Sequence, residues 1–309
     1  MNPFPDGERY SRLSTGLRRR FGKPVRTVTL RGNFGCPNRD GRKGHGGCLF
    51  CSESALVPRA PDPFGPICSQ LESGIAAAER RARECGILAY FQDGTVTAAP
   101  RERLEPMLRE ALAHPRVLLL AIGTRPDFLP DDVLDLLSAL SKEKPVWLEI
   151  GLQVASDPLL ARMNRNHSVA DFADAARRAR ERGLEVIAHL ILDFPGEDEG
   201  DRLETAALLN RLGVTGVKVH NLHVLKDTPL EPMWRRGEIP LSSMDEYAAL
   251  AGRFLEYLDP AIVVHRLTGE GPAGQMLAPR WALDKGRVIH KIRAELERRD
   301  TWQGRMRAG

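Results

Sequence analysis

The chain has 309 residues, of which 42% are hydrophobic and 28% are charged, and its formal net charge is +4. Such a chain can bury a large core as one barrel-sized domain, or as one domain with an appendage. The charge is only mildly basic and does not by itself identify a nucleic-acid-binding protein. No apolar run approaches the roughly 18 residues of a membrane-spanning helix, and residues 1–8 lack the basic-then-apolar order of a signal peptide.

Five cysteines, an odd number with three of them crowded together, argue against a disulfide framework and favour a reducing compartment. Because no membrane or export signal accompanies them, we expect a cytoplasmic protein without a membrane partner. We interpret Cys68 and Cys85 as small, buried, apolar residues on helix-like segments rather than as metal ligands.

Short aliphatic or β-branched runs alternate with amphipathic stretches along most of the chain. The runs predict six strands at 25–30, 86–92, 116–123, 145–151, 184–193 and 214–220. The amphipathic stretches predict helices at 70–84, 103–113, 131–141, 169–182 and 201–212. Repeated strand-helix units of this length predict a parallel α/β sheet, with too few units for the usual closed eight-fold barrel.

The two ends of the chain differ from this repeating region. Residues 1–24 predict a short basic helical segment around Arg18-Arg-Arg20, and residues 25–258 form the repeating core. Residues 259–309 predict an extension with a short strand at 261–265, a Gly/Pro-rich loop, and a helix at 285–299 that turns Val288, Ile292 and Leu296 inward.

Cys36, Cys48 and Cys51 follow the first predicted strand in a glycine-rich segment, with no fourth cysteine nearby. Three thiolates suit an iron-sulfur cluster with one iron left open, because structural zinc and clusters used only for electron transfer normally take four ligands. Taken alone, these cysteines leave zinc and no metal as alternatives. The cluster is the favoured interpretation.

A series of further motifs follows these cysteines in chain order. It runs through Cys-Pro-Asn-Arg-Asp-Gly with Gly-Gly-Cys-Leu-Phe-Cys51, Ala89-Tyr-Phe-Gln92, Gly123-Thr-Arg-Pro-Asp127, Leu148-Glu-Ile-Gly-Leu-Gln153, Met163-Asn-Arg-Asn-His167, Ala188-His-Leu, Pro195-Gly-Glu and Lys218-Val-His220. Over roughly residues 20–280 the chain thereby resembles the radical S-adenosylmethionine (radical SAM) superfamily. Within it, the chain resembles the YhcC/YtqA-type subgroup, a relative of the radical SAM part of the Elongator catalytic subunit. The long first cysteine interval departs from the commonest Cys-x3-Cys-x2-Cys pattern but is the subgroup's own form.

The resemblance implies an open partial (βα)6 TIM-like barrel of the radical SAM type, with a C-terminal extension. It implies a 4Fe-4S cluster on Cys36, Cys48 and Cys51, with S-adenosylmethionine (SAM) as ligand of the open iron. Reductive cleavage of SAM would give a deoxyadenosyl radical, with the electron supplied by an external donor such as a flavodoxin or ferredoxin. Chemistry is then expected at the C-terminal ends of the strands.

Six residues match family positions around SAM, and two more, Thr124 and Glu149, line the same face and are predicted to help. The adenine side is matched by Phe50, and the amino group by Gly94 and Thr95, where Asp93 replaces the first glycine of the family's Gly-Gly motif. The carboxylate is matched by Arg165, whose planar fork suits it. The remaining predicted SAM contacts are Thr124, Glu149, Gln153 and His189.

His220 and His223 are the predicted catalytic residues on the substrate side. They are three positions apart, so on a continued strand they would point to opposite faces, and both reach the barrel mouth only if the chain turns after His220. A hydrogen-bonded structural role is the alternative for each histidine.

Basic residues concentrate near both ends of the chain and could converge on a phosphate-facing surface. They are Arg9, Arg12, Arg18, Arg19, Arg20 and Lys23, and Lys285, Arg287, Lys291, Arg293, Arg298, Arg299, Arg305 and Arg307. Solvated helix faces would explain the same charges. The subgroup resemblance favours tRNA as partner, with modification of the wobble-uridine side chain as the function.

Two alternatives to this function stay open at the level of sequence. One is a radical SAM enzyme that acts on a small metabolite or a protein. The other is a non-catalytic iron-sulfur protein for electron transfer or redox sensing, although Gln153 and Arg165 argue against it because a carrier needs no SAM pocket.

Overall fold

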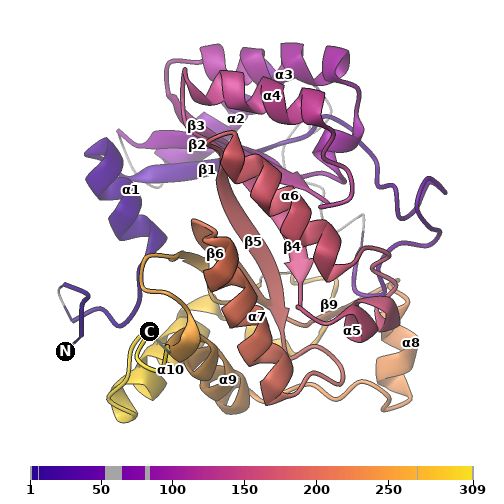
Figure 1. The fold of residues 1–309 in the computed structure, drawn as a ribbon, viewed down its shortest axis with the longest axis vertical. Helices are drawn as coiled ribbons and strands as arrows, with labels where there is room; N and C mark the ends of the chain where they lie inside the picture. The colour runs from indigo at the N-terminus through magenta and orange to yellow at the C-terminus, as the bar shows by residue number, and fades with distance from the viewer. Residues whose placement is uncertain (1, 6, 53–64, 81–83, 270, 308–309) are drawn as a thin grey trace.

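The computed structural model describes residues 2–5, 7–52, 65–80, 84–269 and 271–307. Its centre is a curled seven-stranded sheet in which every strand pair is parallel (Figure 1). The strands follow the order β1 (Val25–Leu30), β2 (Gly86–Phe91), β3 (Val117–Thr124), β4 (Val146–Gln153), β5 (Glu185–Leu192), β6 (Gly216–Asn221) and β8 (Val263–Arg266). The predicted open partial barrel is therefore confirmed.

Most of the helices connect successive strands and cover the outer face of the sheet. The helices after β1 are α2 (Ile67–Glu79), α3 (Arg101–Ala113), α4 (Asp131–Ser141), α5 (Asp157–Arg162), α6 (Val169–Glu181), α7 (Glu199–Leu212), α8 (Leu230–Arg235), α9 (Met244–Tyr257) and α10 (Lys285–Arg298). A short antiparallel pair, β7 (Val224–Leu225) with β9 (Met276–Ala278), follows the end of β6. Parallel strands need such crossover helices, which explains the alternating sequence pattern.

Local sequence signals fix where several helices begin. At the start of α6 the Ser168 hydroxyl accepts a hydrogen bond from the Asp171 backbone N–H. The Asp171 carboxylate accepts one from the Ser168 backbone N–H, so the two residues form a capping box. The same device starts α7 at Asp198 and α9 at Ser243. These caps stabilise helix N-termini by satisfying backbone N–H groups that have no partner within the helix.

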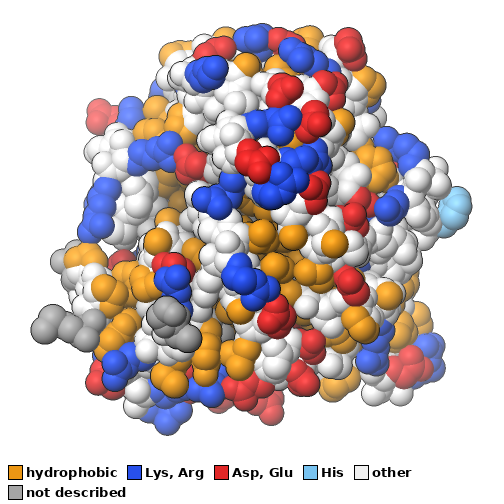
Figure 2. Space-filling view, viewed as in Figure 1, with side chains coloured by type: hydrophobic (Ala, Val, Ile, Leu, Met, Phe, Trp, Pro, Cys, Tyr) orange, Lys and Arg blue, Asp and Glu red, His pale blue; other side chains and the backbone are white. Residues whose placement is uncertain are grey.

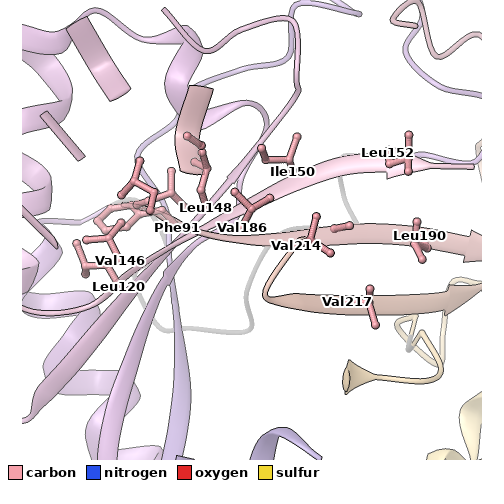
Figure 3. Close-up of a cluster of buried hydrophobic side chains, with 14 of the residues drawn as sticks. Phe91, Leu120, Val146, Leu148, Ile150, Leu152, Val186, Leu190, Val214 and Val217 are labelled. Carbon is pink, nitrogen blue, oxygen red and sulfur yellow. The ribbon is translucent and has the colours of Figure 1, made fainter. Parts of the chain in front are cut away.

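The main core lies between the sheet and its outer helices. Alternate strand residues point into this layer, among them Leu120, Leu148, Ile150, Val186 and Leu190 (Figure 3). These side chains are almost completely buried. Burial of apolar area at about 25 cal/mol per Å² is the main force that holds helices on the sheet.

The intervening strand residues face the concave interior of the half-barrel. At its lower end, where the strands begin, this face is apolar, with Leu88, Leu119 and Trp147 packed together. Helix α1 (Leu13–Phe21) closes this end: it contacts both edge strands, β1 and β8, and buries Leu17 in the same cluster. The upper part of the interior, toward the C-terminal strand ends, is polar.

The predicted C-terminal extension contributes the seventh strand. Strand β8 pairs in parallel with β6, and α10 packs on α9 with Val288, Ile292 and Leu296 buried as predicted. Helices α5, α8 and α9 were not predicted. The boundaries of the predicted domains at 24 and 258 stay predictions.

The expectation for the two remaining cysteines is wrong for one of them. Cys68 is exposed on the first turn of α2, whereas Cys85 is buried in the segment that leads into β2, outside any helix. No helix among the described residues is both long and apolar enough to cross a bilayer.

Candidate functional site

The three clustered cysteines lie in the loop that leaves the C-terminal end of β1. Cys48 is buried, and Cys36 and Cys51 are partly exposed. Burial raises the pKa of the Cys51 thiol, and the nearby charges of Cys48 and Cys36 raise it further, so the three sulfurs interact electrostatically. Within the described residues, no three His, Cys, Asp or Glu side chains are close enough to share one metal ion. A multi-iron cluster places each cysteine on a different iron and does not need that spacing.

Two nitrogen donors point at the Cys48 sulfur. Arg165 Nη1 lies 3.3 Å from Cys48 Sγ, and Asn38 Nδ2 lies 3.6 Å from it. N–H groups directed at a sulfur favour a thiolate and tune the metal that the thiolate binds. This donor set fits a cysteine ligand of a cluster better than a neutral buried thiol.

An asparagine network holds the cysteine loop against the loop that follows α5. Asn38 donates to the Asn164 carbonyl at 2.7 Å and accepts from Asn166 Nδ2 at 2.7 Å. Asn164 in turn donates to the Gly47 carbonyl at 2.7 Å. Asn164 and Asn166 both have φ of 53°, a left-handed conformation that asparagine tolerates better than most residues. The Met-Asn-Arg-Asn-His motif is thus partly a brace for the cysteine loop.

The Asp93-Gly94-Thr95 segment meets the cysteine loop from the end of β2. Asp93 accepts from the backbone N–H groups of Gly32 and Asn33 at 3.1 and 2.7 Å. Thr95 N–H donates to the Gly35 carbonyl at 2.8 Å. Asp93 therefore orders the start of the cysteine loop, which gives a structural reason for an acid in place of the family's glycine.

Gly94 allows this close approach and leaves a polar group free above it. Its φ is 64°, and a Cβ atom there would lie 1.8 Å from the Gly35 carbonyl oxygen, so no other residue fits. The Thr95 hydroxyl oxygen is buried without a hydrogen-bond partner among the described residues. Such an orphaned group is expected where a bound molecule completes the bonding.

Arg165 and Gln153 converge over Gly151 at the end of β4. A Cβ atom on Gly151 would lie 2.5 Å from Arg165 Nη2 and 2.8 Å from Gln153 Nε2. Gln153 has a φ of 76°, which is strained for a side chain of its type. Arg165 Nε is buried with no hydrogen-bond partner in the described part of the chain. Two predicted SAM contacts therefore share one place beside Cys48.

Thr124 and Phe50 are more closely tied to the protein. Thr124 Oγ1 lies 2.5 Å from Thr97 Oγ1 and is buried at the end of β3. Phe50 packs edge-to-face on Phe194, with ring centroids 6.3 Å apart. Their assignment as SAM contacts stays a prediction.

Glu149 and His189 belong to a polar network inside the barrel. Glu149 is buried, with His189 Nε2 at 2.7 Å and Lys218 Nζ at 2.6 Å. Burial disfavours its charge, but Lys218 and the bond from His189 outweigh burial and hold the Glu149 pKa well below its usual value. Burial lowers the pKa of both His189 and Lys218. The pair Glu149–Lys218 forms a buried ion pair with a neutral histidine beside it.

The two predicted catalytic histidines meet although they are three residues apart. Strand β6 ends at Asn221, and the chain then turns, so both rings approach the Gly269 backbone. A Cβ atom on Gly269 would lie 2.6 Å from His223 Cε1 and 2.9 Å from His220 Nδ1. His220 also stacks on His189 at 5.7 Å. Burial lowers the pKa of His220 well below its usual value and that of His223 to about 4.

Sequence reasoning missed several members of this network. Lys218 lies over the ring of Tyr90 at 4.2 Å, and Asn221 accepts from Thr268 and from the Gly269 backbone at 3.0 Å. The spacing of Lys218 and His220 could have revealed Lys218, because residues two positions apart on a strand point to the same face. Arg266 gave no such signal, since its inward position depends on an irregularity between β6 and β8.

Taken together, these residues fit the predicted cofactors. A buried cysteine with two N–H donors suits a cluster ligand, and Thr95 and Arg165, which respectively follow β2 and adjoin the end of β4, have atoms without a partner among the described residues. The described structure thus offers sulfur ligands and polar contacts on the same edge of the barrel.

Comparison with known proteins agrees with this geometry. Residues 34–209 match the family model of the radical SAM superfamily, and residues 214–298 match that of the radical SAM C-terminal domain. The chain is 37% identical over 307 residues to the Bacillus subtilis protein YtqA, covering 98% of this chain and 95% of YtqA. It is 38% identical over 266 residues to Escherichia coli YhcC, covering 86% of this chain and 85% of that protein.

Among solved structures, the fold resembles that of the archaeal Methanocaldococcus infernus Elp3 with an N-terminal deletion. The TM-score is 0.69 at 19% identity, covering 90% of this chain and 64% of the other. At this identity the likeness concerns the fold alone.

Proposed function

The chain belongs to the radical SAM superfamily, whose enzymes use a 4Fe-4S cluster and SAM, and we propose that this radical SAM enzyme modifies the side chain of the tRNA wobble uridine. The observation that carries the enzymatic part is the meeting of Cys48, Arg165 and Gln153 at one strand edge. The wobble uridine as substrate is a separate proposal that rests on other observations.

We assign cluster ligation to Cys36, Cys48 and Cys51, and the SAM contacts to residues around Gly151. When bound, the cluster and SAM supply reductive cleavage of SAM to a reactive carbon radical. Arg165 would pair with the SAM carboxylate through its free Nε edge while it keeps its bond to Cys48. Thr95 and Gln153 would take the other polar groups of SAM. An external one-electron donor, such as a flavodoxin or ferredoxin, would reduce the cluster.

The substrate would enter the polar interior beside this edge. Glu149 lies on β4 two positions before Gly151, so its side chain points to the same face. His189, His220 and His223 continue that face across β5 and β6 toward Gly269. Their lowered pKa values keep these histidines neutral near pH 7, ready to accept or donate a hydrogen bond.

Two observations support tRNA as the substrate. The chain is 26% identical over 257 residues to a protein named tRNA uridine(34) acetyltransferase from Methanocaldococcus infernus, covering 70% of this chain and 47% of that protein. The two basic ends also adjoin: Arg9 pairs with Asp300 at 3.0 Å, and the Gln303 N–H donates to the Arg9 carbonyl at 2.9 Å.

Only some of the terminal basic residues are available to phosphates. Acidic neighbours pair with Arg9, Arg12, Arg20, Lys291, Arg298, Arg299 and Arg307. Exposed side chains with no ion pair in the described residues are Arg18, Arg19, Lys23, Arg287 and Arg305. On the face covered by α3, α4 and α6, basic and acidic side chains are interspersed (Figure 2). The terminal elements are therefore the better candidate for tRNA contact.

Mass spectrometry of tRNA nucleosides tests the proposed substrate. Cells that lack the gene should accumulate a wobble uridine with an unprocessed side chain, and the wild-type gene should restore the processed nucleoside. A gene carrying Cys48→Ala should fail to restore it. Identical nucleosides with and without the gene would favour a small metabolite or a protein as substrate.

A further inference from the structure

One cation in the barrel interior has no counter-ion among the described residues. Arg266 ends β8 and lies opposite Lys218 of β6, after a register shift between Val217 and Lys218. This irregularity lets two successive residues reach the interior. His265 packs on Trp147 with ring centroids 4.7 Å apart, and the charge of Arg266 acts on the rings of His220 and His223.

The charges around Arg266 do not balance. Its side chain has no hydrogen bond or ion pair within the described residues, whereas Lys218 is already paired with Glu149. The other groups on which its charge acts are His189, His220, His223 and Tyr90, and none of them carries a negative charge near pH 7, because burial raises the pKa of the Tyr90 phenol well above its usual value. Burial keeps the three histidines neutral, so the interior carries one uncompensated positive charge. A partly buried charge of this kind is costly unless an anion joins it.

A second unsatisfied group lies beside Arg266. His220 Nε2 is buried with no hydrogen-bond partner in the part of the chain that the structure describes. The ring is held in place by its stacking on His189 and by close contact with Gly269. Gly269 is fixed in turn by its N–H bond to Asn221 Oδ1 at 3.0 Å. Because Arg266 pairs in the sheet with Lys218 and His220 is two positions further along β6, a fixed ring nitrogen and a guanidinium without a partner among the described residues lie on one face of neighbouring strands.

We propose that Arg266 and His220 bind an oxyanion of the substrate, a carboxylate or a phosphate group, inside the barrel. This inference rests on the proposed function in taking the interior as the substrate cavity. A guanidinium matches such groups because it donates two parallel hydrogen bonds, and His220 in its Nε2–H tautomer adds a third. A substrate whose buried end is cationic is disfavoured by the same unbalanced charge.

Histidine ring signals in NMR spectra test this site directly. The protein is reconstituted with its cluster, labelled at the histidine rings and saturated with SAM, so that the carboxylate of SAM has its own partners. Sodium acetate and inorganic phosphate are then titrated separately. We expect saturable shifts of the His220 and His223 signals, and the anion with the higher affinity identifies the group as a carboxylate or a phosphate.

Three variants separate the role of Arg266 from general effects. Arg266→Gln should weaken the preferred anion about tenfold or more, as expected for removal of a charge-assisted pair. Arg266→Lys should bind the anion with intermediate affinity, because it keeps the charge without the planar fork. If Arg266→Gln does not fold, the affinity of Arg266→Lys alone tests the site. Arg235→Gln on exposed α8 should bind like the wild type.

Absence of any saturable shift, or equal affinity in wild type, Arg266→Gln and Arg266→Lys, would overturn the assignment. The titration contains no tRNA, so its failure is independent of the proposed tRNA substrate. Conversely, anion binding at Arg266 together with unaltered tRNA nucleosides would retain the site and reject the wobble uridine.

Discussion

At the scale of single residues, Arg165 links the sulfur ligand to the expected SAM site. It reaches Cys48 Sγ with one terminal nitrogen and the Gly151 carbonyl with the other, at 3.3 and 3.2 Å. Its Nε is buried without a partner in the described part of the chain. The sequence motif predicted a carboxylate partner for this arginine but gave no sign of its bond to Cys48, because that bond depends on how two distant loops pack.

Replacement of Arg165 should therefore affect both ligands. Arg165→Ala should weaken SAM binding by about 1.5 to 3 kcal/mol, the usual range for a hydrogen bond to a charged group. It should also change the reduction potential of the cluster, since it removes an N–H donor to sulfur. Binding titration and a redox titration followed by EPR spectroscopy measure the two effects. Arg162→Ala, on the exposed side of α5, is the matched control, and equal SAM affinity in both variants would contradict the assignment.

Asp93 provides a test of the loop that carries the cysteines. Asp93→Ala removes the acceptor for two backbone N–H groups at the start of this loop. Leaving a buried donor such as the Gly32 N–H unsatisfied costs about 1 to 3 kcal/mol, so the reconstituted variant should hold less iron. Iron counted per chain measures this, with Asp93→Asn as a partial rescue. Full iron content in Asp93→Ala would show that the loop is ordered by other contacts.

The buried histidines predict how stability depends on pH. His223 has a folded-state pKa of about 4 against 6.5 for an ordinary histidine, so below pH 6.5 the unfolded chain binds a proton that the folded chain does not. The contribution is present above pH 6.5 and declines as pH falls toward 4, by up to about 3 kcal/mol. His223→Gln should flatten this decline in denaturant unfolding measured across that range. An unchanged pH profile would indicate that His223 is solvated.

At the scale of elements, the repeating pattern predicted much of the fold. The range 25–30 matches β1 because it is rich in β-branched residues, and 131–141 matches α4 because its apolar residues recur at helical spacing over about three turns. The short helices α5 and α8 were missed, since six residues show too little periodicity. The irregularity between β6 and β8 could not be predicted at all, because it arises from pairing between segments far apart in sequence.

The sequence predicted helix α1 as a short basic segment but did not predict where it packs. In the structure α1 closes the lower end of the half-barrel by burying Leu17 against the sheet. Leu17→Ala should cost about 2 to 5 kcal/mol, the range for large-to-small changes in a core. Denaturant unfolding measures this, with Leu283→Ala, at 37% exposure, as control. Equal stability of both variants would mean that α1 is not part of the folded core.

At the scale of the whole molecule, cofactor chemistry and RNA recognition fall on different parts of the chain in this account. The predicted cofactor residues gather at the C-terminal strand ends, whereas the basic residues proposed to contact tRNA lie on the terminal segments. The first group stands in short local motifs that the sequence shows directly, and its cofactor roles stay predictions. The sequence could not separate paired from unpaired charges, since the pairing of Arg299 with Glu256, for example, depends on how α9 and α10 pack.

Salt dependence tests the second group. Changing Arg18, Arg19, Lys23, Arg287 and Arg305 to Gln should weaken tRNA binding and flatten its dependence on salt, by about one unit of log-log slope for each phosphate that the variant no longer neutralises. A control of equal charge change is the set Arg101, Arg109, Arg177, Arg211 and Arg235 to Gln. Filter binding across a salt series measures both. Equal slopes for the two sets would place the tRNA elsewhere.

The central claim is that Cys36, Cys48 and Cys51 hold a cluster that cleaves SAM. Chromatographic measurement of deoxyadenosine formed from SAM by the reconstituted, reduced protein tests it most directly. The wild type, Cys68→Ala and Cys85→Ala should all form deoxyadenosine, and Cys36→Ala, Cys48→Ala and Cys51→Ala should form none. No deoxyadenosine from the wild type, or its absence in Cys68→Ala or Cys85→Ala while one of the other three variants still forms it, would contradict the account.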